Sequence, residues 1–181
     1  ILGGSLGAER INDTILRSLK RLTERYQIIH QTGKDNFEDV KKIADIELTG
    51  SKYRDRYKLF PFLNNLAMRM SAGVAGLVIT RAGSTIFEIA SWGIPSIIVP
   101  IPETISRDQR SNAFAYAHSG AAIVIEEENF DDDILISQIS SILESKDRIE
   151  YMSTRAQSFA KRDASRKIAR KLISIGLEHS V

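Results

Sequence analysis

Short apolar runs alternate with helical patterns along residues 1–125 of the chain. The runs are bounded by turn residues and are rich in β-branched and aromatic side chains, which is typical of buried strands. The first run, Ile1 and Leu2, ends in a glycine turn. We predict five further strands, at residues 26–30, 57–62, 76–80, 95–101 and 121–125.

Helical spacing fills the intervals between the predicted strands. Apolar residues recur at this spacing in two stripes: Ile11, Ile15, Leu19 and Leu22, then Val40, Ile43 and Ala44. The alternation of strand and helix predicts an α/β fold, a Rossmann-like parallel sheet with helices on both faces. After residue 125 the pattern is helical only, with one helix predicted over residues 131–145 and one long helix over residues 149–177.

The first predicted strand has only two residues before its glycine turn. Strands are typically about five or six residues long. We therefore expect the sequence to begin within or just before this strand, with a further domain upstream. Residues 1–181 fit one domain.

Composition narrows the function classes without changing the predicted fold. The chain has no cysteine, which excludes disulfides, thiolate metal sites and cysteine nucleophiles. Its formal net charge of +2 is too small to indicate nucleic acid as a partner. No apolar run reaches the roughly 20 residues that a membrane-spanning helix needs.

The first candidate site is the turn GGSLGA at residues 3–8. Glycines let a ligand approach the backbone closely, and the free N–H groups that open the next helix attract anions, so a phosphate is the expected ligand. The turn lacks the dinucleotide pattern GxGxxG, because Leu2 replaces its first glycine, and it also lacks the P-loop Gly-Lys-Ser/Thr. A tight turn with nothing bound is the alternative.

The second candidate site is TRAGSTIFE at residues 80–88, where a buried strand leads into a helix. Ser84 or Thr85 could cap that helix or bind a phosphate. Glu88 follows Thr85 by three residues, so the pair could form a capping box, T-x-x-E. Alternatively, the Glu88 carboxylate could accept hydrogen bonds from both hydroxyls of a ribose.

The third candidate site follows the strand predicted at residues 95–101. Gln109 and Asn112 are three residues apart, so they share one face of a helix, and their amides suit the hydroxyls of a sugar. Two exposed polar residues on a first helical turn are the alternative.

Other charged and titratable residues have structural explanations. The acidic runs at residues 126–128 and 131–133 could suggest a metal site, but the second run precedes a helix, where Asp is a common N-cap. A basic helical segment could be a solvated face or could contact an anionic membrane surface; its residues are Lys161, Arg162, Arg166, Lys167, Arg170 and Lys171. His30, His118 and His179 lie in unrelated contexts and indicate no catalytic triad.

Five ordered motifs together resemble the carboxyl-terminal half of the MurG family of bacterial glycosyltransferases. They are GGSLGA, HQTGK, RAGSTIFE, GIPSIIVP and DQRSNA with a following GAA, and the resemblance covers residues 1–127. The family transfers N-acetylglucosamine from UDP-N-acetylglucosamine to undecaprenyl-linked muramyl-pentapeptide during peptidoglycan synthesis. An ordered set of motifs is far more specific than any one of them.

The resemblance implies that residues 1–181 are the UDP-sugar donor-binding domain of a GT-B enzyme, and that the absent half binds the lipid acceptor. It also implies a role for each matching position. Gly4, Ser5 and Gly7 would hold the pyrophosphate together with Ser84 and Thr85, Glu88 would bind the ribose, Gln109 and Asn112 the transferred sugar, and the backbone at Phe62 and Leu63 the uracil edge.

The resemblance further implies an inverting transfer that uses no metal and no other cofactor. The helix N-termini and backbone donors would ease the departure of UDP. The general base is expected in the absent half, so residues 1–181 alone should bind donor without turnover. Peripheral attachment to the cytoplasmic face of the inner membrane is expected mainly through that half.

Three other functions remain open from the sequence. The chain could belong to a related GT-B enzyme with another UDP-sugar, to a UDP-sugar epimerase, or to a nucleotide-sugar-binding module without catalysis.

Overall fold

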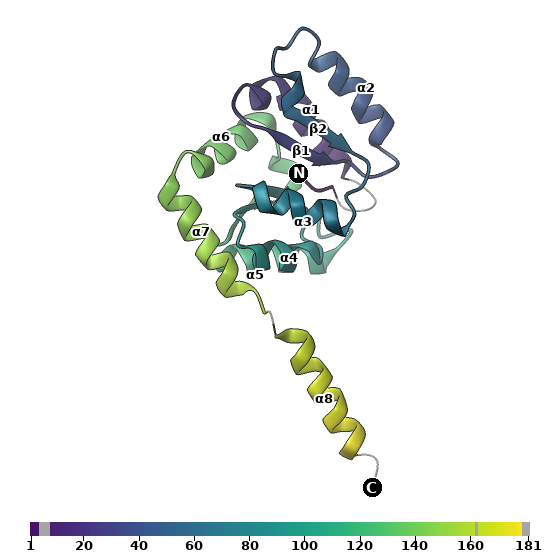
Figure 1. Cartoon of the computed structure of the whole chain (residues 1–181), viewed down its shortest axis with the longest axis vertical. Coiled ribbons are helices and arrows are strands. Elements are labelled where there is room, and N and C mark those ends of the chain that lie inside the picture. The colour runs from purple at the N-terminus through teal and green to yellow at the C-terminus, as the bar shows by residue number, and fades with distance from the viewer. Residues whose placement is uncertain (4–7, 162, 179–181) are drawn as a thin grey trace.

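The computed structural model of the chain describes residues 1–3, 8–161 and 163–178. Its strands all run parallel (Figure 1). They are β1 (Ile28–Gln31), β2 (Tyr57–Phe60), β3 (Val78–Thr80), β4 (Ser96–Ile98) and β5 (Ala122–Val124). The predicted strands are confirmed, although each observed strand is shorter than its prediction and β1 and β3 each begin two residues later than expected.

Leu2 joins the two parts of the sheet. It forms parallel bridges with Gln31 at the end of β1 and with Thr80 at the end of β3. The order across the sheet is therefore β2, β1, Leu2, β3, β4, β5. This is a Rossmann-like order. Strands β1 and β2 follow one another on one side of Leu2, and β3, β4 and β5 follow one another on the other side. Leu2 therefore marks the switch point of the strand order, where such sheets bind ligands.

Helices cover both faces of the sheet, as predicted (Figure 1). One face packs against α1 (Glu9–Arg25), α2 (Phe37–Glu47) and α6 (Asp132–Leu143), and the other against α3 (Asn65–Val74), α4 (Thr85–Trp92) and α5 (Arg107–His118). Neighbouring residues of β4 show the alternation, because Ile97 joins the first core and Ile98 the second. Short 3₁₀ turns occupy Arg54–Arg56 and Glu127–Asn129.

The predicted apolar stripe of α1 is confirmed, since Ile11, Ile15 and Leu19 are fully buried and Leu22 nearly so. The second stripe is wrong in one position: Val40 and Ala44 are buried, but Ile43 is 43% exposed. The helix predicted at residues 131–145 is confirmed as α6.

The single helix predicted over residues 149–177 is wrong, because the structure has two helices there. They are α7 (Lys146–Phe159) and α8 (Ala164–Glu178), and Ala160 has an extended backbone between them. Phe159, the last residue of α7, packs against the Tyr116 ring, with 4.9 Å between ring centroids. Helix α7 therefore contacts the body up to its last residue. Helix α8 then extends away from the body (Figure 1).

Candidate functional site

The candidate site lies at the edge of the sheet where the strands end. Strands β3 and β4 are hydrogen-bonded neighbours, and they lead into α4 and α5 respectively. The N-termini of these two helices therefore lie side by side at this edge. Three predicted phosphate-binding residues, Gly4, Ser5 and Gly7, lie outside the described residues, and their role stays a prediction.

The start of α4 decides between the two interpretations of Glu88. The helix begins at Thr85, Ser84 occupies the N-cap position, and no side chain caps the helix. The capping-box alternative is therefore wrong, because Thr85 lies inside the helix. Glu88 is exposed, and its carboxylate forms no hydrogen bond or ion pair within the described part of the chain.

The start of α5 carries both predicted amides. Gln109 and Asn112 are half-buried residues of this helix, three positions apart and hence on one face. The Oε1 atom of Gln109 is buried and accepts no hydrogen bond from any described residue. Buried polar atoms without a partner are rare, so this oxygen indicates a binding position.

The predicted backbone contact at Leu63 is partly occupied by the protein itself. The Leu63 N–H donates to Oε1 of Gln31 at 2.8 Å. A base placed here would compete with Gln31 for that N–H group.

Two ion pairs frame the same edge, and sequence reasoning missed them. Arg81 pairs with Glu127, and its Nη1 also donates to the carbonyls of Val99 at 3.1 Å and Pro100 at 3.2 Å. Arg110 donates to Oε1 of Glu126 from Nε at 3.1 Å and from Nη2 at 2.9 Å. No sequence signal could have found these pairs, because their members lie on different elements.

The second acidic run has the capping role predicted for it. Asp131 caps α6 by accepting the N–H of Ile134 at 2.8 Å. Asp132 and Asp133 pair with Arg17 and Arg21. Among the described residues no cluster of three or more His, Cys, Asp or Glu side chains could hold a metal ion.

His30 belongs to a buried hydrogen-bond network under the site. Its Nδ1 lies 2.9 Å from the Tyr57 hydroxyl and its Nε2 lies 3.1 Å from Oδ1 of Asn12. Asn12 donates its Nδ2 to the Thr32 carbonyl, so its Oδ1 accepts from His30 and the Tyr57 hydroxyl donates to Nδ1. Burial, and secondarily the amino group of Ile1, hold the pKa of His30 well below its usual range.

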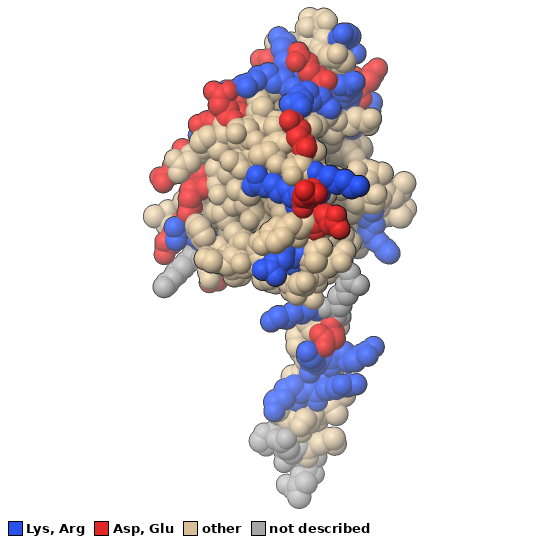
Figure 2. Space-filling model, turned by 90° about the vertical axis from the view of Figure 1, so that its left-hand side faces the viewer, with Lys and Arg blue, Asp and Glu red and all other residues tan. Residues whose placement is uncertain are grey.

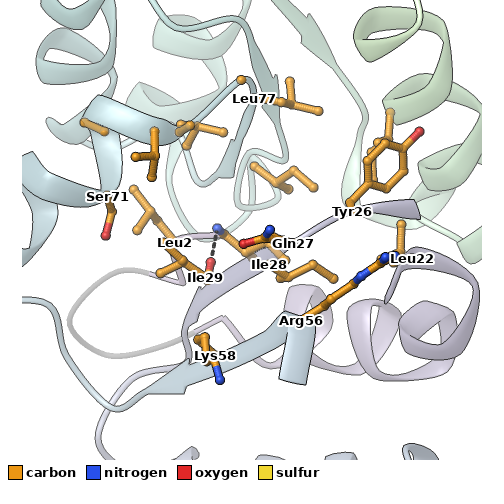
Figure 3. Close-up of a pocket in the computed structure, with 18 of the residues that line it drawn as sticks. Leu2, Leu22, Tyr26, Gln27, Ile28, Ile29, Arg56, Lys58, Ser71 and Leu77 are labelled. Atoms are coloured by element: carbon orange, nitrogen blue, oxygen red, sulfur yellow. Dashed lines mark hydrogen bonds between the residues drawn. The ribbon is translucent and has the colours of Figure 1, made fainter. Parts of the chain in front are cut away.

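A cavity of about 690 Å³ opens at the opposite edge of the sheet, where β1 and β3 begin (Figure 3). Leu2, Leu22, Ile28, Ile29 and Leu77 line it with aliphatic side chains (Figure 3). Of the described site residues only Leu63 reaches it. Arg25, Arg56 and Lys58 also line this cavity, but it lies away from the helix N-termini. The carboxyl edge, where such sheets bind ligands and where helix N-termini favour anions, is therefore the better candidate for a diphosphate.

The basic segment predicted in the tail lies mainly on α8. Lysine and arginine side chains gather on this projecting helix, whereas both signs of charge are mixed over the visible face of the body (Figure 2). Exposed apolar residues share the helix with them: Ile168, Leu172, Ile173, Ile175 and Leu177. Within the described ranges, none of the helices combines the length and the apolarity needed to cross a bilayer.

Comparison of the sequence with known proteins identifies the family of the chain. The model of the glycosyltransferase family 28 C-terminal domain matches residues 1–168. A relative from Methylococcus capsulatus is named UDP-N-acetylglucosamine--N-acetylmuramyl-(pentapeptide) pyrophosphoryl-undecaprenol N-acetylglucosamine transferase. It is 36% identical over 173 residues, which are 94% of this chain and 46% of that protein. A relative of the same name from Ruminiclostridium cellulolyticum is 36% identical over 92% of this chain and 45% of its own length.

Solved structures with a similar fold include a protein of the same family. MurG of Acinetobacter baumannii matches 96% of this chain and 48% of its own chain, with a TM-score of 0.78 and 26% identity. A UDP-N-acetylglucosamine 2-epimerase matches 93% of this chain and 42% of its own with a TM-score of 0.64, but at 16% identity it shows a shared fold alone.

The chain spans about half the length of the curated relatives that it matches. Its fold is that of the carboxyl-terminal half of a GT-B glycosyltransferase, and the resemblance to the MurG family is confirmed. Since the family model matches residues 1–168, the chain belongs to the family of glycosyltransferase family 28 C-terminal domains.

Proposed function

We propose that the chain binds UDP-N-acetylglucosamine as the donor domain of an inverting glycosyltransferase of peptidoglycan synthesis. The complete enzyme would transfer N-acetylglucosamine to an undecaprenyl-linked muramyl-pentapeptide, the reaction named for the curated relatives. One observation carries the proposal: the buried amide oxygen of Gln109 has no partner among the described residues, at the switch-point edge of a Rossmann-like sheet.

The nucleotide would lie across the N-termini of the helices at this edge. Its diphosphate would bind between the turn of Gly4, Ser5 and Gly7 and the start of α4 at Ser84 and Thr85. The free N–H groups and the positive end of the α4 dipole favour an anion there.

The ribose and the transferred sugar would bind beyond the diphosphate. The Glu88 carboxylate is exposed and unpartnered in the described chain, so it can accept both ribose hydroxyls. Gln109 and Asn112 would bind the sugar hydroxyls from one face of α5. The uracil would meet the backbone beside Leu63.

The chemistry follows from this placement. An acceptor hydroxyl attacks the anomeric carbon, the bond to the diphosphate oxygen breaks, and the configuration inverts. The helix N-termini stabilise the negative charge that develops on the departing UDP, so this part of the enzyme needs no metal or other cofactor. The general base and the acceptor site would belong to the other half of the enzyme.

The acceptor also determines the location that we propose. An undecaprenyl carrier is confined to the membrane, so the enzyme would act at the cytoplasmic face of the inner membrane by peripheral association. Residues 1–181 alone should therefore bind the donor without transferring its sugar.

Calorimetric titration of the chain tests the proposal. We expect binding of UDP-N-acetylglucosamine and UDP, and no comparable binding of GDP or NAD. Glu88→Gln should weaken UDP binding about 10- to 100-fold, because charge-assisted hydrogen bonds are worth about 1.5–3 kcal/mol.

The matched control is Glu150→Gln, which removes an exposed carboxylate on α7. It should leave both affinities unchanged. Equal affinity of Glu88→Gln and wild type for UDP would remove Glu88 from the site, and comparable affinity for GDP or NAD would refute the uridine-nucleotide assignment.

A further inference from the structure

Two adjacent acidic residues after β5 each hold a different arginine. Glu126 accepts two hydrogen bonds from Arg110, and Glu127 pairs with Arg81. The Arg81 side chain is 15% exposed and that of Glu127 is 26% exposed, whereas Arg21 and Asp133 on the surface are 56% and 87% exposed. The pair of Arg81 with Glu127 is therefore less screened by water than an ordinary surface pair.

The Arg81 side chain connects the ends of three neighbouring strands. Arg81 follows β3, its Nη1 donates to the carbonyls of Val99 and Pro100 directly after β4, and its ionic partner Glu127 follows β5. The loop between β4 and α5 is consequently held at its origin by Arg81, and Glu127 holds Arg81 in turn.

The Arg110 side chain holds the other end of that loop. Arg110 lies in the first turn of α5, directly after Gln109. Its guanidinium contacts Glu126 and lies 4.9 Å from the centroid of the Phe114 ring. Because consecutive helical residues keep a fixed angle about the axis, fixing Arg110 also fixes the direction in which Gln109 projects.

We propose that Glu126 and Glu127 are positioning residues that determine how tightly the enzyme holds the sugar of its donor. They do so through Arg110 and Arg81, which set the β4–α5 loop and the first turn of α5 and thereby aim the Gln109 amide, whose Oε1 has no partner among the described residues. This inference rests on the proposed function. Arg81 shares the β3–α4 loop with Ser84, where the diphosphate would bind, but its side chain contacts Glu127 and the β4–α5 loop. The two glutamates should therefore affect the sugar more than the nucleotide.

The test compares two ligands with each variant. We expect Glu126→Gln and Glu127→Gln to weaken UDP-N-acetylglucosamine binding about tenfold, the value of one misaligned hydrogen bond, while UDP affinity stays within about twofold of wild type. The matched control Asp133→Asn breaks the exposed pair with Arg21 and should change neither affinity. Exchange of the charges in the double variant Arg110→Glu/Glu126→Arg should restore most of the lost selectivity.

The outcomes separate this inference from the proposed function. Wild-type selectivity in both Glu126→Gln and Glu127→Gln would overturn the positioning role and leave donor binding intact. An equal loss for UDP and UDP-N-acetylglucosamine would also overturn it, because it would reveal a general structural role. If wild type binds neither ligand, the proposed function fails, and this inference fails with it.

Discussion

Acidification should destabilise the folded chain through His30, the buried imidazole below the candidate site. This side chain is fully buried, and its burial, followed by the nearby amino group of Ile1, lowers its pKa well below the usual value of about 6.5. In the unfolded chain the same imidazole takes up a proton near pH 6.5. Below that pH the unfolded state binds more protons than the folded state, so the free energy of unfolding falls as the pH falls.

The size of the effect follows from this linkage. Between pH 7.5 and 5.5 the unfolded imidazole becomes largely protonated while the folded one stays neutral, which costs about 1.4 kcal/mol. The variant His30→Gln lacks this contribution. It should also be less stable by about 1–3 kcal/mol at pH 7.5, because Tyr57 loses the acceptor for its buried hydroxyl.

Urea denaturation of both proteins at pH 7.5, 6.5 and 5.5 measures the difference. The stability advantage of wild type over His30→Gln should shrink by about 1.4 kcal/mol across this range. Carboxylates and the amino group of Ile1, whose pKa burial lowers to about 5, also titrate, but both proteins carry them. An advantage that stays constant or grows on acidification would refute the reasoning, and so would an imidazole NMR titration of folded His30 near pH 6.5.

Two further substitutions test local backbone structure by urea denaturation. Gly93→Ala should lower the free energy of unfolding by about 1–2 kcal/mol, because Gly93 has φ 71° and an added Cβ would lie 2.6 Å from Nε2 of Gln157. Its control Gly73→Ala, with nothing within 4 Å of the new Cβ inside a helix, should raise it by about 0.5–1 kcal/mol, and an equal loss in both would contradict the argument. Asp131→Ala should cost about 0.5–2 kcal/mol, since it removes the cap of the Ile134 N–H, and unchanged stability would show that the cap contributes nothing.

The sequence predicts this fold well because its main signals are local. The alternation of apolar runs with helical spacing indicates a parallel sheet with two covered faces, and each strand is found within a few residues of its expected position. Helix α1 shows the same reliability, since Ile11, Ile15 and Leu19 cover the core at regular helical spacing.

The sequence pattern predicts neither helix α3 nor the break in the chain after α7. In residues 65–74 the exposed side chains Leu66, Met70 and Val74 are apolar, and the core-facing Ala67, Met68 and Ala72 are only partly buried, so the apolar pattern does not mark which face meets the core. The helical spacing of the tail continues through Ala160, where the packing of Phe159 against Tyr116 ends and the chain changes direction.

The sequence alone determined the fold class, because short apolar spacing carries that information. Its ordered motifs also indicated the family and, through that resemblance, Glu88, Gln109 and Asn112 as candidates. Only the tertiary structure decided that Glu88 forms no capping box and that the Gln109 oxygen is buried without a partner in the described chain. The same holds for the pairing of Glu126 and Glu127 with two arginines. These facts depend on contacts between elements distant in sequence, and such contacts exist only once parallel strands bring their ends to one edge.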